Sequence, residues 1–180
     1  MNNMKYLASL FIAFFLFSFV VFTQPAIAVD YRLLKITDEL NEPWGLAFLP
    51  NGDLLVTELS GYMKRVSNGK VSDPIHNVPE VLYEGQGGLM DVVLHPNFTT
   101  NNLVYLTYAA GTSEANHLVL MRARLEGDAL MNPEILYKTQ NRNRPVHYGG
   151  RLVFLNDGSL ILTHGAVSYT HLTLPTIREV

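Results

Sequence analysis

Short apolar runs separated by turn residues recur along the middle of the chain. Residues 46–49 are apolar, a Pro-Asn-Gly turn follows at 50–52, and a second apolar run leads into the threonine that ends 54–57. The same phrase returns 106 positions later, at 152–163, with Asn-Asp-Gly as its turn. The pattern predicts a strand, a tight turn and a second strand in each copy.

A third, looser copy lies between these two, at residues 91–107. Two repeats within 106 residues give about 50 residues per repeat, the length of a propeller blade. Residues 63–71 contain an Asn-Gly turn typical of a hairpin, and 117–125 alternate between apolar and polar positions. Since no helical period is sustained after the N-terminal segment, we predict an all-β fold, a β-propeller with about three blades in this chain.

The N-terminal segment has the pattern of an export signal. Lys5 precedes an apolar run at 7–22 that only two serines interrupt, and residues 26–28 read Ala-Ile-Ala. We predict a signal peptide over 1–28, cleaved near Ala28, and a periplasmic or secreted protein with no membrane attachment after cleavage. A membrane anchor is the alternative, because an apolar stretch of about 17 residues approaches the length of a spanning helix.

The C-terminal segment breaks the apolar pattern. Residues 167–176 read Val-Ser-Tyr-Thr-His-Leu-Thr-Leu-Pro-Thr, which matches the translation of a common transposase sequencing adaptor. Our hypothesis is that native sequence ends at Gly165 and that 166–180 is an adaptor artefact; a natural tail is the alternative. Residues 29–165 would then be the N-terminal blades of a longer propeller.

Composition removes several classes of function. The chain has no cysteine, which excludes disulfides, thiolate metal sites and cysteine nucleophiles. Its 13 basic and 16 acidic side chains leave a net charge of −3, with no basic footprint for nucleic acid. An apolar content of 48 % excludes a disordered chain.

Candidate chemistry lies in the loops that precede the apolar strands, because propeller sites are built at one end of the central axis. Three glycine-bearing segments qualify, at 41–45, 84–88 and 146–151. Gln86 offers an amide donor and acceptor, with a solvated glutamine beside a bulged strand as the alternative. His147 is suited to act as a general base, with a packed or surface histidine as the alternative.

Other polar residues are weaker candidates. We expect Asp91 to tie adjacent loops together and Arg151 to pair with a carboxylate between blades. Glu58 ends a predicted strand and could face the axis. The remaining histidines have no metal-binding spacing, so we predict no metal ligand in this chain.

At these motifs the chain resembles a known family. Residues 43–50, 55–58, 85–98 and 147–152 resemble the soluble aldose sugar dehydrogenases that depend on pyrroloquinoline quinone (PQQ), the glucose/sorbosone dehydrogenase family. The resemblance covers about 40–165 and implies a six-bladed β-propeller. It also implies His147 as the general base and Gln86 as a residue that contacts PQQ.

The resemblance implies the reaction as well. Aldose sugars would be oxidised to lactones by hydride transfer to PQQ, with an external electron acceptor as partner. The Ca²⁺ ligands and the other PQQ ligands would lie in later blades that this chain lacks, so we expect it to be inactive alone. The chain departs from the family pattern at two places. Val146 stands where some glucose-active members have aspartate, which bears on sugar recognition or on tuning of the base. His164-Gly165 stands where a Leu-Gly-Asp sequence is usual.

Two other functions remain open at this stage. A calcium-dependent lactonase-type propeller hydrolase would need axial acidic ligands, and Glu58 is the residue here that motivates it. A non-catalytic binding propeller is the second, because a fold alone does not fix a function. Replacing His147 by alanine separates a dehydrogenase from a binding module.

Overall fold

The computed structural model describes residues 31–165 and 176–178. The chain divides into two units, Met1–Leu34 and Lys35–Val180. Of the first unit only 31–34 are described, and they form neither helix nor strand. The predicted signal peptide and most of the predicted adaptor-derived tail lie outside the described residues, so these boundaries stay predictions. Within the described part of the chain, no helix is long and apolar enough to cross a membrane.

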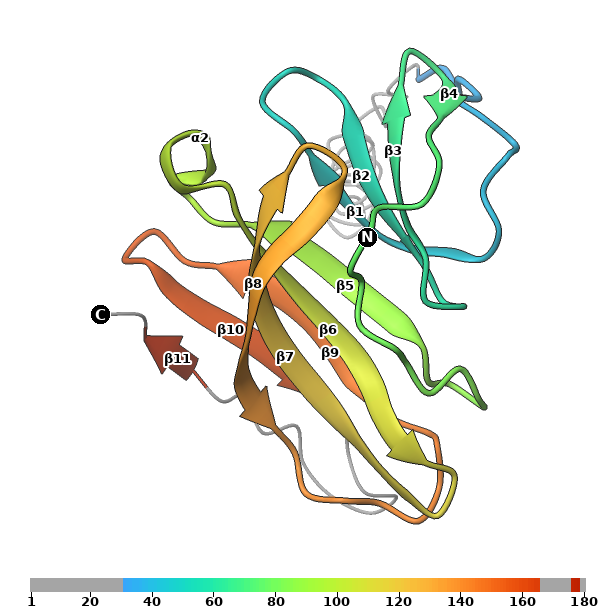
Figure 1. Ribbon diagram of the computed structural model, residues 1–180, viewed down its shortest axis with the longest axis vertical. Helices are drawn as coiled ribbons and strands as arrows, with labels where there is room; N and C mark the ends of the chain where they lie inside the picture. Colours follow the sequence, from blue (N-terminus) through green and yellow to red (C-terminus); the bar gives the residue numbers. More distant parts are fainter. Residues whose placement is uncertain (1–30, 166–175, 179–180) are drawn as a thin grey trace, which may run out of the picture. The chain divides into compact units, whose positions relative to one another are not determined.

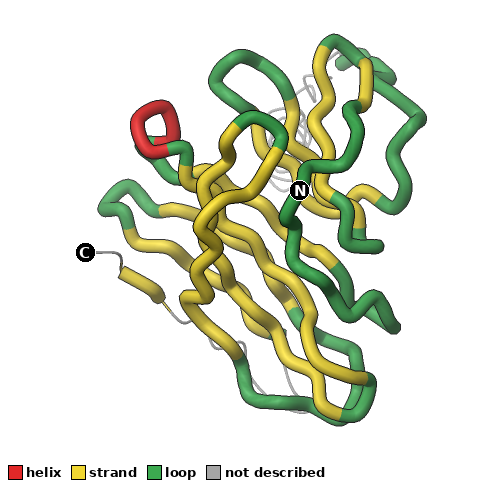
Figure 2. Tube along the Cα trace, viewed as in Figure 1, coloured by secondary structure: helices red, strands yellow, loops and turns green. Residues whose placement is uncertain are grey.

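The second unit is built almost wholly from antiparallel strands, which confirms the predicted all-β propeller fold (Figure 1). The first sheet contains β1 (Pro43–Phe48), β2 (Leu54–Glu58), β3 (Met63–Ser67) and β4 (Lys70–Val71). The second contains β5 (Leu89–Leu94), β6 (Leu103–Thr112), β7 (Ala115–Glu126) and β8 (Ala129–Lys138). The third contains β9 (Gly149–Phe154), β10 (Ser159–His164) and β11 (Thr176–Arg178). Figure 2 shows how little helix accompanies these strands; the helix among the described residues is α2 (Phe98–Asn101).

The repeated sequence phrase forms the same turn twice. Gly52 follows β1 with a φ of 89°, and its N–H donates to the Leu49 carbonyl at 2.9 Å. Gly158 follows β9 with a φ of 83°, and its N–H donates to the Leu155 carbonyl at 3.0 Å. Glycine adopts this left-handed backbone without the steric cost that a β-carbon brings. The predicted strand–turn–strand units are therefore confirmed in the first and third sheets.

Two strands were not expected from the sequence. Strand β8 pairs with β7 although its residues are mostly exposed, so it carries little apolar alternation to predict it. Strand β11 pairs with β10 and falls within the predicted adaptor-derived segment. Neighbouring strands supply the backbone partners in both cases, and sequence periodicity does not record such partners.

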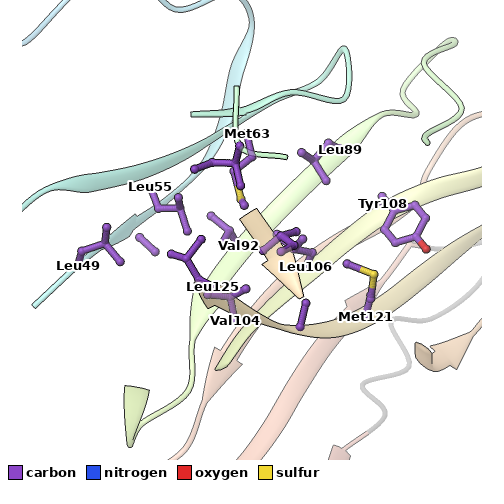
Figure 3. Packing of buried hydrophobic residues seen from close by; sticks show 14 of the residues in the cluster. Leu49, Leu55, Met63, Leu89, Val92, Val104, Leu106, Tyr108, Met121 and Leu125 are labelled. Atoms are coloured by element: carbon purple, nitrogen blue, oxygen red, sulfur yellow. The ribbon is translucent and has the colours of Figure 1, made fainter. Parts of the chain in front are cut away.

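The core consists of two apolar layers, one between each pair of neighbouring sheets. The layer between the first and second sheets contains Leu55 and Met63 from one side and Val92, Leu106 and Met121 from the other (Figure 3). The layer between the second and third sheets joins residues of β5, β6 and β7 to residues of β9 and β10. A four-stranded sheet cannot bury both faces alone, so stacking of blades supplies this burial.

Two buried threonines, Thr57 and Thr107, also link neighbouring sheets, while a third, Thr163, is half-buried. Thr57, Thr107 and Thr163 occupy equivalent positions on β2, β6 and β10, and each Oγ1 accepts a backbone N–H from the preceding strand of its own sheet. The Thr57 hydroxyl donates onward to the Met90 carbonyl of the second sheet. The Thr107 hydroxyl donates to the Gly150 carbonyl of the third sheet at 2.6 Å. These two bonds fix β5 and β9, the first strands of the second and third sheets, against the preceding sheet.

The outer faces of the first and third sheets carry exposed apolar residues. Trp44, Leu46 and Phe48 on β1 are exposed, and the first two border a mainly apolar groove of about 380 Å³. Val153 and Leu155 are exposed beside β9. Uncovered apolar faces are what the repeat pattern leads us to expect where a blade lacks a neighbour.

Candidate functional site

The loops before β5 and β9 meet at one end of the sheets. The Gln86 N–H donates to the Pro145 carbonyl at 2.8 Å, and the His147 N–H donates to Gln86 Oε1 at 2.7 Å. Gln86 and His147, the two site residues predicted from the sequence, are therefore in direct contact in the fold. The loop before β1 joins this end differently, through Glu42, whose carboxylate accepts a hydrogen bond from the Tyr83 hydroxyl. That bond raises the pKa of Tyr83.

His147 has an unusual backbone and an exposed side chain. Its φ is 57°, in the left-handed region that few non-glycine residues adopt. Its N–H is bonded to Gln86, and its carbonyl accepts from Arg142 Nη1 at 2.6 Å. No hydrogen bond to its ring is formed by the part of the chain that the structure describes. His147 is exposed, which excludes a packed histidine, while a surface histidine stays the alternative to the predicted base.

Gln86 is exposed, but it is not simply solvated. Its carbonyl oxygen holds the His147 backbone, while its amide nitrogen forms no hydrogen bond with any described residue. An amide carries two N–H donors on that nitrogen. Gln86 therefore has one group that positions His147 and a second group free to donate to a ligand. Its contact with a cofactor remains a prediction.

Arg142 is a residue of this site that the sequence analysis missed. Its guanidinium donates to the carbonyls of Val146 at 3.2 Å, His147 at 2.6 Å and Gly165 at 3.0 Å, and it also contacts His164 Nε2. Burial lowers the pKa of Arg142. The polar run before β9 contains Arg142 and Arg144 alike, and nothing in the sequence separates the two.

Tyr148 holds the same loop through its buried side chain. The Arg142 guanidinium lies 5.8 Å from the centre of the Tyr148 ring. The Tyr148 hydroxyl donates to Asn116 Oδ1 at 2.6 Å, and both residues are buried. The backbone of Asn116 pairs with that of Arg142 through two hydrogen bonds, at 2.7 and 3.0 Å. Burial raises the pKa of the Tyr148 hydroxyl, which keeps it a donor.

The expected pairing of Arg151 with a carboxylate between blades is confirmed. Arg151 Nη1 donates to Asp91 Oδ1 at 3.0 Å, and the Leu152 N–H donates to Asp91 Oδ2 at 2.8 Å. Asp91 is buried within β5 and ties that strand to β9, which agrees with its predicted linking role. Buried carboxylates need such partners, because an unpaired charge in the interior is costly.

Glu58 is buried and occupied by its neighbours. It accepts the Asn41 N–H at 2.7 Å and the Lys64 ammonium at 3.1 Å. Both hydrogen bonds fall on Oε1, and the suggestion that the carboxylate faces the axis stays a prediction. Within 31–165, no group of three or more histidine and acidic side chains lies close enough to hold a metal ion.

The chain is similar to a known family of dehydrogenases. The family model described as Glucose / Sorbosone dehydrogenase matches residues 40–174. The aldose sugar dehydrogenase of Escherichia coli strain K12 is 36 % identical over 156 residues, which cover 82 % of this chain and 41 % of that protein. The chain thus spans about two fifths of the length of this relative.

The chain is also similar to solved structures of dehydrogenases. A crystal structure described as glucose dehydrogenase matches with a TM-score of 0.70 at 35 % identity, over 73 % of this chain and 40 % of that one. The PQQ-bound form of the aldose sugar dehydrogenase from Streptomyces coelicolor matches with a TM-score of 0.61 at 30 % identity, over 74 % of this chain and 40 % of that one.

Proposed function

Because the chain belongs to the glucose/sorbosone dehydrogenase family, we propose that the whole protein is an exported quinoprotein that oxidises aldose sugars to lactones. The observation that carries the proposal is the pairing of an exposed His147 with Gln86 at the ends of two neighbouring blades. The likeness to a PQQ-bound aldose sugar dehydrogenase supports PQQ as the cofactor.

The described residues suit one edge of a PQQ site. PQQ is a flat quinone with three carboxylates, so it needs hydrogen-bond donors at its oxygens and cations at its charges. The free amide nitrogen of Gln86 fits the first need, while Arg142 is already engaged with its own chain. We therefore expect the cationic ligands, and the Ca²⁺ ligands, in later blades of the whole protein.

His147 has the chemistry that the sugar requires. Oxidation of an aldose at its anomeric carbon removes the hydroxyl proton. It also removes the hydrogen on that carbon together with the bonding electron pair, as a hydride. When bound, PQQ supplies the two-electron acceptor for that hydrogen and electron pair. The imidazole of His147 takes the hydroxyl proton, since a neutral histidine is a base suited to neutral pH. Gln86 and Arg142 hold the backbone that carries this ring.

Of the two alternatives, neither gains support from the described residues. The lactonase-type hydrolase rested on Glu58, which is engaged with Lys64 and Asn41. A binding propeller is distinguished by experiment, since it would not depend on a base at His147.

The test uses the whole protein with PQQ and Ca²⁺ added, and follows reduction of an artificial dye by sugar. His147→Ala should lower turnover by about 10²–10⁴-fold, the usual contribution of a general base, while PQQ binding followed by calorimetry is retained. His76→Ala is the matched control, because this exposed histidine lies outside the site. Sugar-dependent turnover without PQQ, or full turnover in His147→Ala, would contradict the proposal.

A further inference from the structure

The side chain of Arg142 joins two segments of chain around His147. Its Nη1 donates to the Val146 and His147 carbonyls, and its Nη2 donates to the Gly165 carbonyl. A guanidinium presents its donors in a rigid planar fork, so it holds several acceptors in fixed relative positions. The loop before β9 and the end of β10 are thereby held by one group.

The Arg142 backbone is itself fixed. Its N–H and C=O both pair with Asn116, which is fully buried on β7 and accepts from the Tyr148 hydroxyl. The fork therefore starts from the second sheet and reaches the third. The His147 loop is positioned relative to both sheets rather than by its own local sequence.

His164 fits this arrangement only as a neutral group. Its Nε2 lies against Arg142 Nη2, so this nitrogen must act as the acceptor. Burial and the neighbouring guanidinium both lower the pKa of His164, which keeps the ring neutral. In this chain a histidine thus supplies an uncharged acceptor beside the arginine.

The contact with Arg142 restrains the backbone conformation of His147. Its left-handed φ of 57° is unfavourable for a residue with a β-carbon. Such a conformation persists where surrounding contacts determine it, and here the two contacts are Gln86 at the N–H and Arg142 at the carbonyl. Without the carbonyl contact, the peptide between His147 and Tyr148 loses its direct restraint at the His147 carbonyl.

We propose that Arg142 is a positioning residue, which fixes the His147 backbone so that the exposed imidazole is held where the substrate binds. The inference rests on the proposed function for the purpose of that geometry, but the geometry can be measured without turnover. Arg142 touches neither substrate nor cofactor in this role.

The first experiment follows amide hydrogen exchange by NMR in the full chain, comparing Arg142→Gln and Arg142→Lys with wild type. We expect the His147 amide to exchange about tenfold faster in Arg142→Gln, with a smaller change in Arg142→Lys, because an ammonium keeps the charge but lacks the fork. Arg144→Gln is the matched control, since Arg144 is an exposed arginine in the same loop. The amide of Val119, buried in β7, reports global opening.

The second experiment measures kcat and KM in the whole protein with PQQ and Ca²⁺. Arg142→Gln should lower kcat and leave KM for the sugar nearly unchanged. The inference is overturned if the His147 amide responds equally to Arg142→Gln and Arg144→Gln, or if Val119 accelerates by the same factor. If wild type shows no sugar-dependent turnover while the His147 amide responds as expected, the positioning role stands and the dehydrogenase proposal falls.

Discussion

The threonine links between sheets allow a stability prediction with an internal control. Thr107 is fully buried, its Oγ1 accepts the Asp91 N–H at 3.0 Å, and its hydroxyl donates to the Gly150 carbonyl at 2.6 Å. Thr107→Val keeps the shape and leaves both backbone groups without a partner. Each buried group left so costs about 1–3 kcal/mol, and the added methyl group returns about 0.8 kcal/mol. We expect a loss of about 3 kcal/mol in the free energy of unfolding.

Thr163→Val is the matched control, because Thr163 occupies the equivalent position in the third sheet. It accepts the Arg151 N–H at 2.8 Å, but it is only half-buried, and its hydroxyl reaches no further sheet among the described residues. Water can replace its bond, so the expected loss is about 1 kcal/mol or less. Urea unfolding followed by circular dichroism measures both variants. A Thr107→Val loss below about 0.5 kcal/mol, or an equal loss in the two variants, would refute the reasoning.

Two further predictions use the same unfolding measurement. The ring of Phe154 packs edge-on against that of Tyr105, with 5.1 Å between the ring centres, whereas Phe48, 106 positions earlier, is 72 % exposed. Phe154→Ala should lower the free energy of unfolding by about 2 kcal/mol, and Phe48→Ala by less than about 0.5 kcal/mol. Equal losses in the two variants would contradict the assignment of Phe154 to a packed face and Phe48 to an exposed one. Because the pKa of His164 is lowered from 6.5, the unfolded chain binds a proton that the folded chain resists, so stability is complete above about pH 6.5 and falls as the pH drops below it. His164→Gln should flatten that fall between about pH 7 and about pH 5, and an unchanged slope would show that other groups cause it.

The candidate site shows how far the sequence alone could go. His147 and Gln86 precede apolar strands at matching places in their repeats, and this placement was enough to select both. Their direct hydrogen bond joins residues 61 positions apart, and no local pattern encodes it. Arg142 could not be told from Arg144, because the difference lies in which backbone pairs with the buried Asn116 and which guanidinium reaches the end of β10.

The strands and turns of the first and third blades were determined by the sequence itself, because apolar alternation and a glycine after the first strand act within about ten residues. The threonine that closes each copy of the repeated phrase is likewise visible in the sequence, although the bonds of Thr57 and Thr107 to the next blade are not. Tertiary structure alone decided the pairing of β8, the left-handed backbone of His147 and the role of Arg142. Each of these depends on groups contributed by another strand or another sheet, and such partners become neighbours only when the blades stack.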